Sequence, residues 1–167
     1  MFIILALPRS RTQWLSKFLT HGDITCHHEW ISTRDSLDDI VTLGSHGTAE
    51  TFGAVVWRQL YARIPDAKWV IVKRPIAEVD ASLRRQGYVR CVEHYAAFLR
   101  AAEAAIPALV VDYHDINDRL GEIWAHCRND AMPKGRERMT EVVIDEPLSA
   151  QLARIDHDRI RRLRCSR

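Results

Sequence analysis

Short apolar runs rich in Val, Ile and Leu alternate with segments of helical spacing along this 167-residue chain, and this alternation limits the fold more than any other feature. The strand candidates are residues 2–7, 24–28, 69–73, 108–112 and 141–144. The helix candidates are residues 12–20, 52–64, 76–86, 93–106, 116–127 and 148–163. Strands separated by helices pair in parallel through right-handed crossovers. The pattern predicts an α/β fold, a parallel sheet with helices on both faces, in one domain over residues 1–167.

Two stretches show neither the apolar pattern of a strand nor that of a helix. Residues 43–51 contain Gly44 and Gly47, and residues 129–140 contain Pro133 and Gly135. Ligands of open parallel sheets bind beyond the carboxyl ends of the strands. We therefore expect either stretch to be irregular and to form a mobile loop over such a site.

Composition excludes several classes of protein. The net charge of +2 argues against a general nucleic-acid binder. No apolar run approaches about 18 residues, and the first strand candidate lacks a basic segment before it, so we expect neither a membrane span nor a signal peptide. The four cysteines form no CxxC pair, which favours reduced thiols in a cytoplasmic protein. The basic residues 159–164 are interpreted as a solvated helix end or as a contact for an anionic partner.

The segment Pro8-Arg9-Ser10-Arg11-Thr12 follows the first strand candidate and opens a helix. Such a turn aims backbone N–H groups and the positive end of the helix dipole at one point, which favours anion binding and a P-loop NTPase-like fold. The alternative is a helix capped by Ser10 with two solvated arginines. The G-x-x-x-x-G-K-[ST] pattern is missing, which counts against an ordinary ATPase or kinase.

The turn and the residues that follow it read P-R-S-R-T-Q-W-L, which resembles the 5′-phosphosulfate loop of the sulfotransferase family, P-[KR]-[ST]-G-T-T-x-[LW]. The resemblance implies a small enzyme of that family, which takes 3′-phosphoadenosine 5′-phosphosulfate (PAPS) as co-substrate. It implies that Arg9 contacts the 5′-phosphate and the sulfuryl group. The residues implied to surround the 5′-phosphate are Ser10, Arg11, Thr12 and Gln13. Arg11 departs from the pattern, because the family usually has glycine there.

A second segment, residues 68–83, resembles the 3′-phosphate motif of the same family. There a buried strand leads to an arginine and a proline-started helix, with a serine eight residues after the arginine; Arg74 and Ser82 have that spacing. Proline suits the first helical turn because its missing N–H has no helical partner there. Pro75 follows the arginine directly, whereas the family often has one residue between, so Lys73 is an alternative to Arg74.

The third segment, Cys26-His27-His28-Glu29, falls where the second strand should end. Tyrosylprotein sulfotransferases have a cysteine followed closely by glutamates here, and the likeness implies that Glu29 is the catalytic base. Cytosolic members use histidine, so His28 or His27 is the rival base. The alternative to a catalytic role is that these residues form a polar strand end whose hydrogen bonds are satisfied within the fold. Adjacent histidines also suggest a metal, but no third ligand lies at a useful spacing, so we expect none.

Trp14 is a candidate for stacking on the adenine or the acceptor, although an aromatic residue at helical spacing is usually part of the core. Together the segments predict transfer of a sulfuryl group from PAPS to a hydroxyl or amine of a small-molecule or peptide acceptor, without a metal. Two alternatives remain open. One is a divergent P-loop phosphotransferase, which would depend on magnesium. The other is a non-catalytic nucleotide-binding module.

Overall fold

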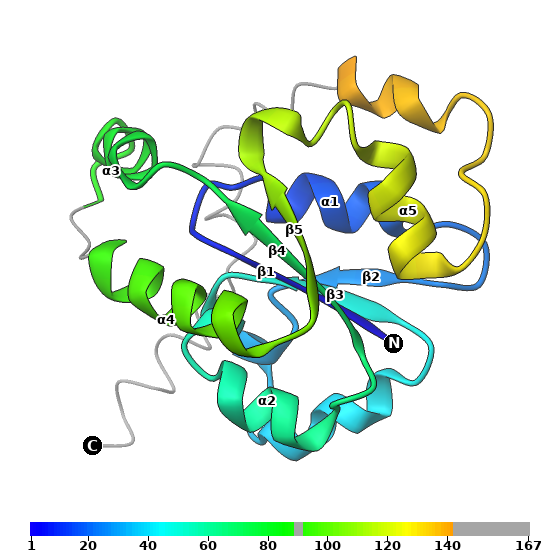
Figure 1. Cartoon of the computed structure of the whole chain (residues 1–167), viewed down its shortest axis with the longest axis horizontal. Coiled ribbons are helices and arrows are strands. Elements are labelled where there is room, and N and C mark those ends of the chain that lie inside the picture. The colour runs from blue at the N-terminus through cyan, green and yellow to red at the C-terminus, as the bar shows by residue number, and fades with distance from the viewer. Residues whose placement is uncertain (89–91, 142–167) are drawn as a thin grey trace, which may run out of the picture.

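A computed structural model of the protein describes residues 1–88 and 92–141, and Figure 1 shows its layered architecture. Five parallel strands form one sheet in the order β2-β3-β1-β4-β5. Their bounds are β1 Phe2–Ala6, β2 Cys26–His28, β3 Gly47–Glu50, β4 Lys68–Lys73 and β5 Ala108–Asp112. The predicted α/β class with a parallel sheet is confirmed.

Helices cover both faces of this sheet, as predicted (Figure 1). Helices α1 (Thr12–Leu19) and α5 (Leu120–Arg128) pack on one face, while α2 (Trp57–Arg63), α3 (Ile76–Arg84) and α4 (Val92–Ala105) pack on the other. Successive residues of a strand point to opposite faces. In β1, Ile4 therefore joins the α1–α5 core, whereas Ile3 and Leu5 join the other one.

The central position of β1 explains its unbroken apolar sequence. Because β1 pairs with β3 on one side and β4 on the other, all five of its residues are buried. Strands covered on both faces are typically continuous apolar runs. The sheet therefore holds the residues that follow β1 at its middle, with two strands on either side.

Strand β3 corrects the prediction that residues 43–51 are irregular. Gly47 is the first residue of the strand. A larger residue does not fit there because the ring of Phe2 covers the position: a Cβ atom would lie 2.2 Å from Phe2 Cε2. Gly44, with φ 56°, ends the preceding short helix η2 (Leu37–Leu43). The small residues Gly47, Thr48 and Ala49 carry no apolar period, yet they are buried and form a strand.

Short 3₁₀ turns account for the other differences. The predicted helix 52–64 divides into η3 (Phe52–Ala54) and α2, and the predicted helix 116–127 begins only at Leu120, after η4 (Tyr113–Asp115). Two further short helices are η1 (Ile31–Thr33) and η5 (Arg136–Glu141), and η5 begins within the stretch 129–140 that was predicted to be irregular. Of the predicted strand 141–144, residue 141 ends η5. The rest of it, the helix 148–163 and the basic residues 159–164 lie outside the described residues. Among the helices that the structure describes, none has the length and apolarity to cross a membrane.

Candidate anion-binding site

The carboxyl ends of all five strands meet at one edge of the sheet, because every strand runs in the same direction (Figure 1). Ligands of open parallel sheets bind at this edge. It carries the turn after β1 and polar residues at or directly after the other strands: Glu29, Glu50, Arg74 and Tyr113. The other two segments singled out in the sequence, which contain Arg74 and Glu29, therefore come together with the turn at one place.

The turn between β1 and α1, residues 8–11 (the β1–α1 turn), has an alternating backbone. Arg9 and Arg11 have positive φ values of 65° and 63°, whereas Ser10 between them does not. A turn in which left-handed residues alternate with others can direct successive N–H groups toward one point, which makes an anion-binding concavity. Such conformations cost non-glycine residues about 1–3 kcal/mol each and are concentrated at functional sites. The backbone geometry therefore supports anion binding.

Two side chains of the β1–α1 turn add to this picture. Arg9 is exposed, and its guanidinium has no ion pair or hydrogen bond to any residue that the structure describes. The hydroxyl of Ser10 is fully buried and likewise has no partner among the described residues. A buried hydroxyl without a partner costs about 1–3 kcal/mol. The turn thus keeps a free charge and an unused donor at the start of α1.

Arginines from two strand ends gather around Tyr113. Arg74 lies 4.0 Å from the Tyr113 ring centroid, and its Nη1 donates to the carbonyl of Arg9 while its Nε donates to Glu78 at 3.3 Å. Arg11 lies 5.7 Å from the same ring and donates to Asn117 Oδ1 at 2.6 Å. The β1–α1 turn, the end of β4 and the start of η4 therefore form one cationic cluster.

The remaining predicted nucleotide contacts have mixed positions. Ser82 is buried two turns into α3, and within the described residues it shares no hydrogen bond with Arg74. The Arg74 side chain instead contacts Glu78 and the carbonyl of Arg9 in the β1–α1 turn. Trp14 is 6% exposed, stacks on Phe18 at 5.1 Å and donates its Nε1–H to Met139 O, which is a core position. Gln13 is half-buried at the start of α1.

The predicted bases stand on the other side of the turn. His28 Nε2 lies 3.1 Å from Thr12 Oγ1 and 3.9 Å from Glu29 Oε1. Burial lowers the pKa of His28, an effect that Glu29 opposes and Lys17 reinforces. Burial therefore favours the neutral form of His28, which can accept a proton. His27 is the next residue of the strand, and its ring lies 6.3 Å from the ring of His46 instead.

Glu29 follows β2 in a left-handed conformation with φ 53°. Its Oε1 accepts a hydrogen bond from Thr51 N at 2.8 Å, and its Oε2 accepts a longer one from Phe52 N at 3.4 Å. These contacts fix the carboxylate across the end of β3. Each oxygen keeps a second lone pair, so the contacts leave the carboxylate able to accept a proton.

Glu50, the last residue of β3, is a site residue that the sequence reasoning missed. Its side chain is fully buried, and Oε1 accepts from Ile31 N at 2.9 Å and from the Thr48 hydroxyl. Oε2 has no partner among the described residues. Burial, followed by the charge of Glu29, raises the pKa of Glu50 to about 7. An acid that titrates near neutrality therefore lies beside the proposed base.

The geometry allows binding of an anion at the turn and acceptance of a proton nearby. Within residues 1–88 and 92–141, no group of three His, Cys, Asp or Glu side chains is arranged to hold a metal ion. Comparison with protein-family models finds no matching family, and comparison with curated proteins finds no match either. The interpretation therefore depends on the residues themselves.

Proposed function

We propose that the protein is a PAPS-dependent sulfotransferase that acts on a hydroxyl or amine of a small-molecule or peptide acceptor. The observation that carries this proposal is the backbone of the β1–α1 turn, where Arg9 and Arg11 are left-handed. Within the described part of the chain the side chains of Arg9 and Ser10 have no partner, and the turn has no Walker lysine. The sequence resemblance of the turn to the 5′-phosphosulfate loop supports the choice of nucleotide.

The reaction is a single displacement for which the site has suitable groups. The bond between sulfur and the oxygen of the 5′-phosphate breaks, and a bond forms between sulfur and the acceptor oxygen or nitrogen. The acceptor loses one proton, and the products are the sulfated acceptor and PAP (3′-phosphoadenosine 5′-phosphate). Arg9 and the turn amides stabilise the negative charge that grows on the departing phosphate oxygen. Removing one such donor typically slows a reaction about 100- to 1000-fold.

Glu29 is proposed to take the acceptor's proton, and His28 is the alternative base. His28 Nε2 lies within 3.9 Å of Glu29 Oε1, so both groups face the same small region next to Thr12. The proposed roles of Arg74 and Ser82 are contacts with the 3′-phosphate. The bond from Arg74 to the Arg9 carbonyl means that Arg74 must shift, or serve the 5′-phosphate as well, when nucleotide binds.

A titration that compares PAP with AMP tests the nucleotide assignment, because the two ligands differ only in the 3′-phosphate. Charge-assisted bonds to that phosphate should make PAP the tighter ligand. At a concentration 100 times its dissociation constant, PAP should stabilise the fold by about 2.7 kcal/mol. Equal binding of PAP and AMP would remove the sulfotransferase proposal. ATP binding that requires magnesium would favour a phosphotransferase instead.

A further inference from the structure

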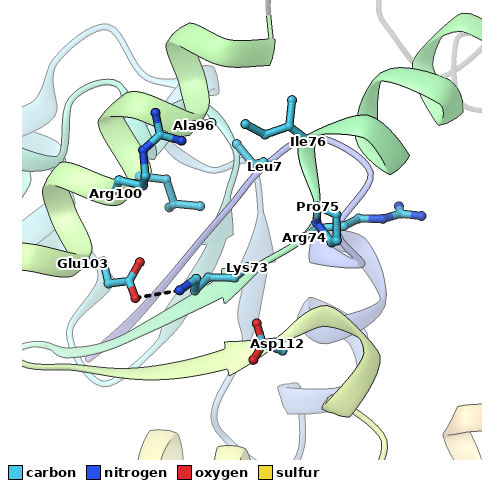
Figure 2. Close-up of a pocket in the computed structure, with 10 residues that line it drawn as sticks. Leu7, Lys73, Arg74, Pro75, Ile76, Ala96, Arg100, Glu103 and Asp112 are labelled. Carbon is cyan, nitrogen blue, oxygen red and sulfur yellow. Dashed lines mark hydrogen bonds and ion pairs between the residues drawn. The ribbon is translucent and has the colours of Figure 1, made fainter.

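A pocket of about 310 Å³ opens beside the β1–α1 turn, between helices α3 and α4 and the ends of β4 and β5 (Figure 2). Its apolar wall is formed by Leu7, Ile76, Ala96 and Leu99. Leu7, Ala96 and Leu99 are at most 4% exposed, so this wall is part of the core. Pockets of this size with an apolar wall and a few polar groups are typical small-molecule sites.

Five charged side chains line the same pocket, and three of them, Lys73, Glu103 and Arg74, already form ion pairs. Lys73 forms an ion pair with Glu103 at 2.9 Å, drawn as a dashed line in Figure 2. Asp112 is the partner of Lys73 in the β4–β5 register, and after Glu103 it contributes to the raised pKa of Lys73. Lys73 is therefore paired with Glu103 and is also influenced by the charge of Asp112.

Arg100 is the cation of the lining that lacks such a partner among the described residues. It projects from α4 beside the apolar wall, and Figure 2 shows it apart from the Lys73–Glu103 pair. Within the described ranges its guanidinium has no ion pair or hydrogen bond, whereas Arg74, the other arginine of the lining, is bound to Glu78 and the Arg9 carbonyl. A free guanidinium beside an apolar wall matches a ligand that combines an apolar body with a carboxylate.

We propose that this pocket binds a small apolar carboxylate, with Arg100 holding the carboxylate and Leu7, Ala96 and Leu99 contacting the apolar body. The pocket adjoins the β1–α1 turn, because Leu7 directly precedes Pro8 and Arg74 bonds to Arg9. The end of a bound molecule that is opposite its carboxylate therefore lies toward the turn. That this molecule is the sulfuryl acceptor depends on the proposed function, whereas its binding does not.

Three phenols of similar size test the proposal in amide NMR titrations of the full chain. They are 4-hydroxyphenylacetate, 4-ethylphenol and tyramine, which carry a carboxylate, no charge and an ammonium group. We expect 4-hydroxyphenylacetate to bind about tenfold or more tightly than 4-ethylphenol, since a charge-assisted pair is added. The shifted amides should include those of Ala96, Leu99 and Arg100. Tighter binding of tyramine would show that Asp112 dominates the pocket and would overturn the proposal.

Variants separate Arg100 from the general positive charge of the protein. R100Q should weaken 4-hydroxyphenylacetate about tenfold or more, R100K should recover part of the loss, and R58Q on α2 should change nothing. Arg100 is exposed, so R100Q should fold and should bind PAP as the unchanged protein does. An R100Q protein that retains full affinity for the carboxylate contradicts the proposal.

PAP titrations on the same samples keep the two proposals apart. Loss of PAP binding with retained carboxylate binding would remove the proposed function and leave the pocket assignment. The reverse result would remove the pocket assignment alone. If 4-hydroxyphenylacetate binds but receives no labelled sulfuryl group from PAPS, small apolar carboxylates are not the acceptors of the reaction.

Discussion

The two halves of the sheet edge differ in charge and in the state of their side chains. The half formed by β1, β4 and β5 carries Arg9, Arg11 and Arg74, and the other half, formed by β2 and β3, carries the bases and acids His28, Glu29 and Glu50. The arginines are exposed or stacked on Tyr113, whereas Glu50 is fully buried beside Glu29. One half is suited to hold an anion and the other to exchange a proton. If the division is correct, substitutions in the two halves should affect different measurements.

The largest expected effect is on turnover. We expect E29Q to bind PAP normally and to lose about 100- to 10,000-fold in the rate of sulfuryl transfer, because glutamine keeps the shape but cannot accept a proton. Labelled PAPS with a screened acceptor gives the rate, and calorimetry gives the affinity. H28A is the matched variant. If H28A is inactive and E29Q fully active, the base is histidine, and loss of PAP binding in E29Q would break the division between the halves.

Binding should depend on the cationic half. We expect R9A to weaken PAP binding about 100-fold or more, since it removes the exposed guanidinium of the turn and its charge-assisted bonds to phosphate. Calorimetric titration measures the change, with R58A as a control for net charge. Unchanged PAP affinity in R9A would place the anion elsewhere on the protein.

Glu50 should make stability fall as pH rises. Its pKa is about 7 in the folded protein, above the ordinary glutamate value of 4.5, so the native state holds a proton that the unfolded chain has lost between these values. The contribution of Glu50 to the free energy of unfolding is therefore complete below about pH 4.5, decreases as pH rises and is lost by about pH 8. The total decrease is about 3 kcal/mol at most. Urea unfolding at pH 5 and pH 8 should show a smaller decrease in E50Q than in the unchanged protein. D66N, at an exposed site, should leave the decrease as it was.

The smallest effect is expected for R11G. Glycine removes the strain of φ 63° but also the bond to Asn117 and the stacking on Tyr113, so the two changes oppose each other. PAP affinity should stay within about tenfold of the original value or improve. A large loss in R11G together with full binding in R9A would mean that the turn is aligned wrongly with the family motif.

The sequence was informative where apolar period and turn chemistry agree. The four described strands other than β3 were predicted because they contain short apolar runs. The start of α1 was predicted because a turn precedes its helical apolar period. β3 was missed because Gly47, Thr48 and Ala49 are small, and the strand exists only because Phe2 and the neighbouring strands bury it. Glu50 was missed with it. The contacts of Arg74 could not be predicted from sequence spacing either. A long side chain at a strand end can reach several partners, and the tertiary structure determines which of them it contacts.

The absence of glycine from the β1–α1 turn has a consequence for the entropy of binding. A glycine-rich loop samples many conformations and must lose this freedom when an anion is bound, whereas Arg9 and Arg11 have fewer states available even in the unfolded chain. In the folded protein both residues are held in the left-handed region. The turn therefore enters binding already ordered, and little further conformational entropy should be lost when a phosphate reaches it.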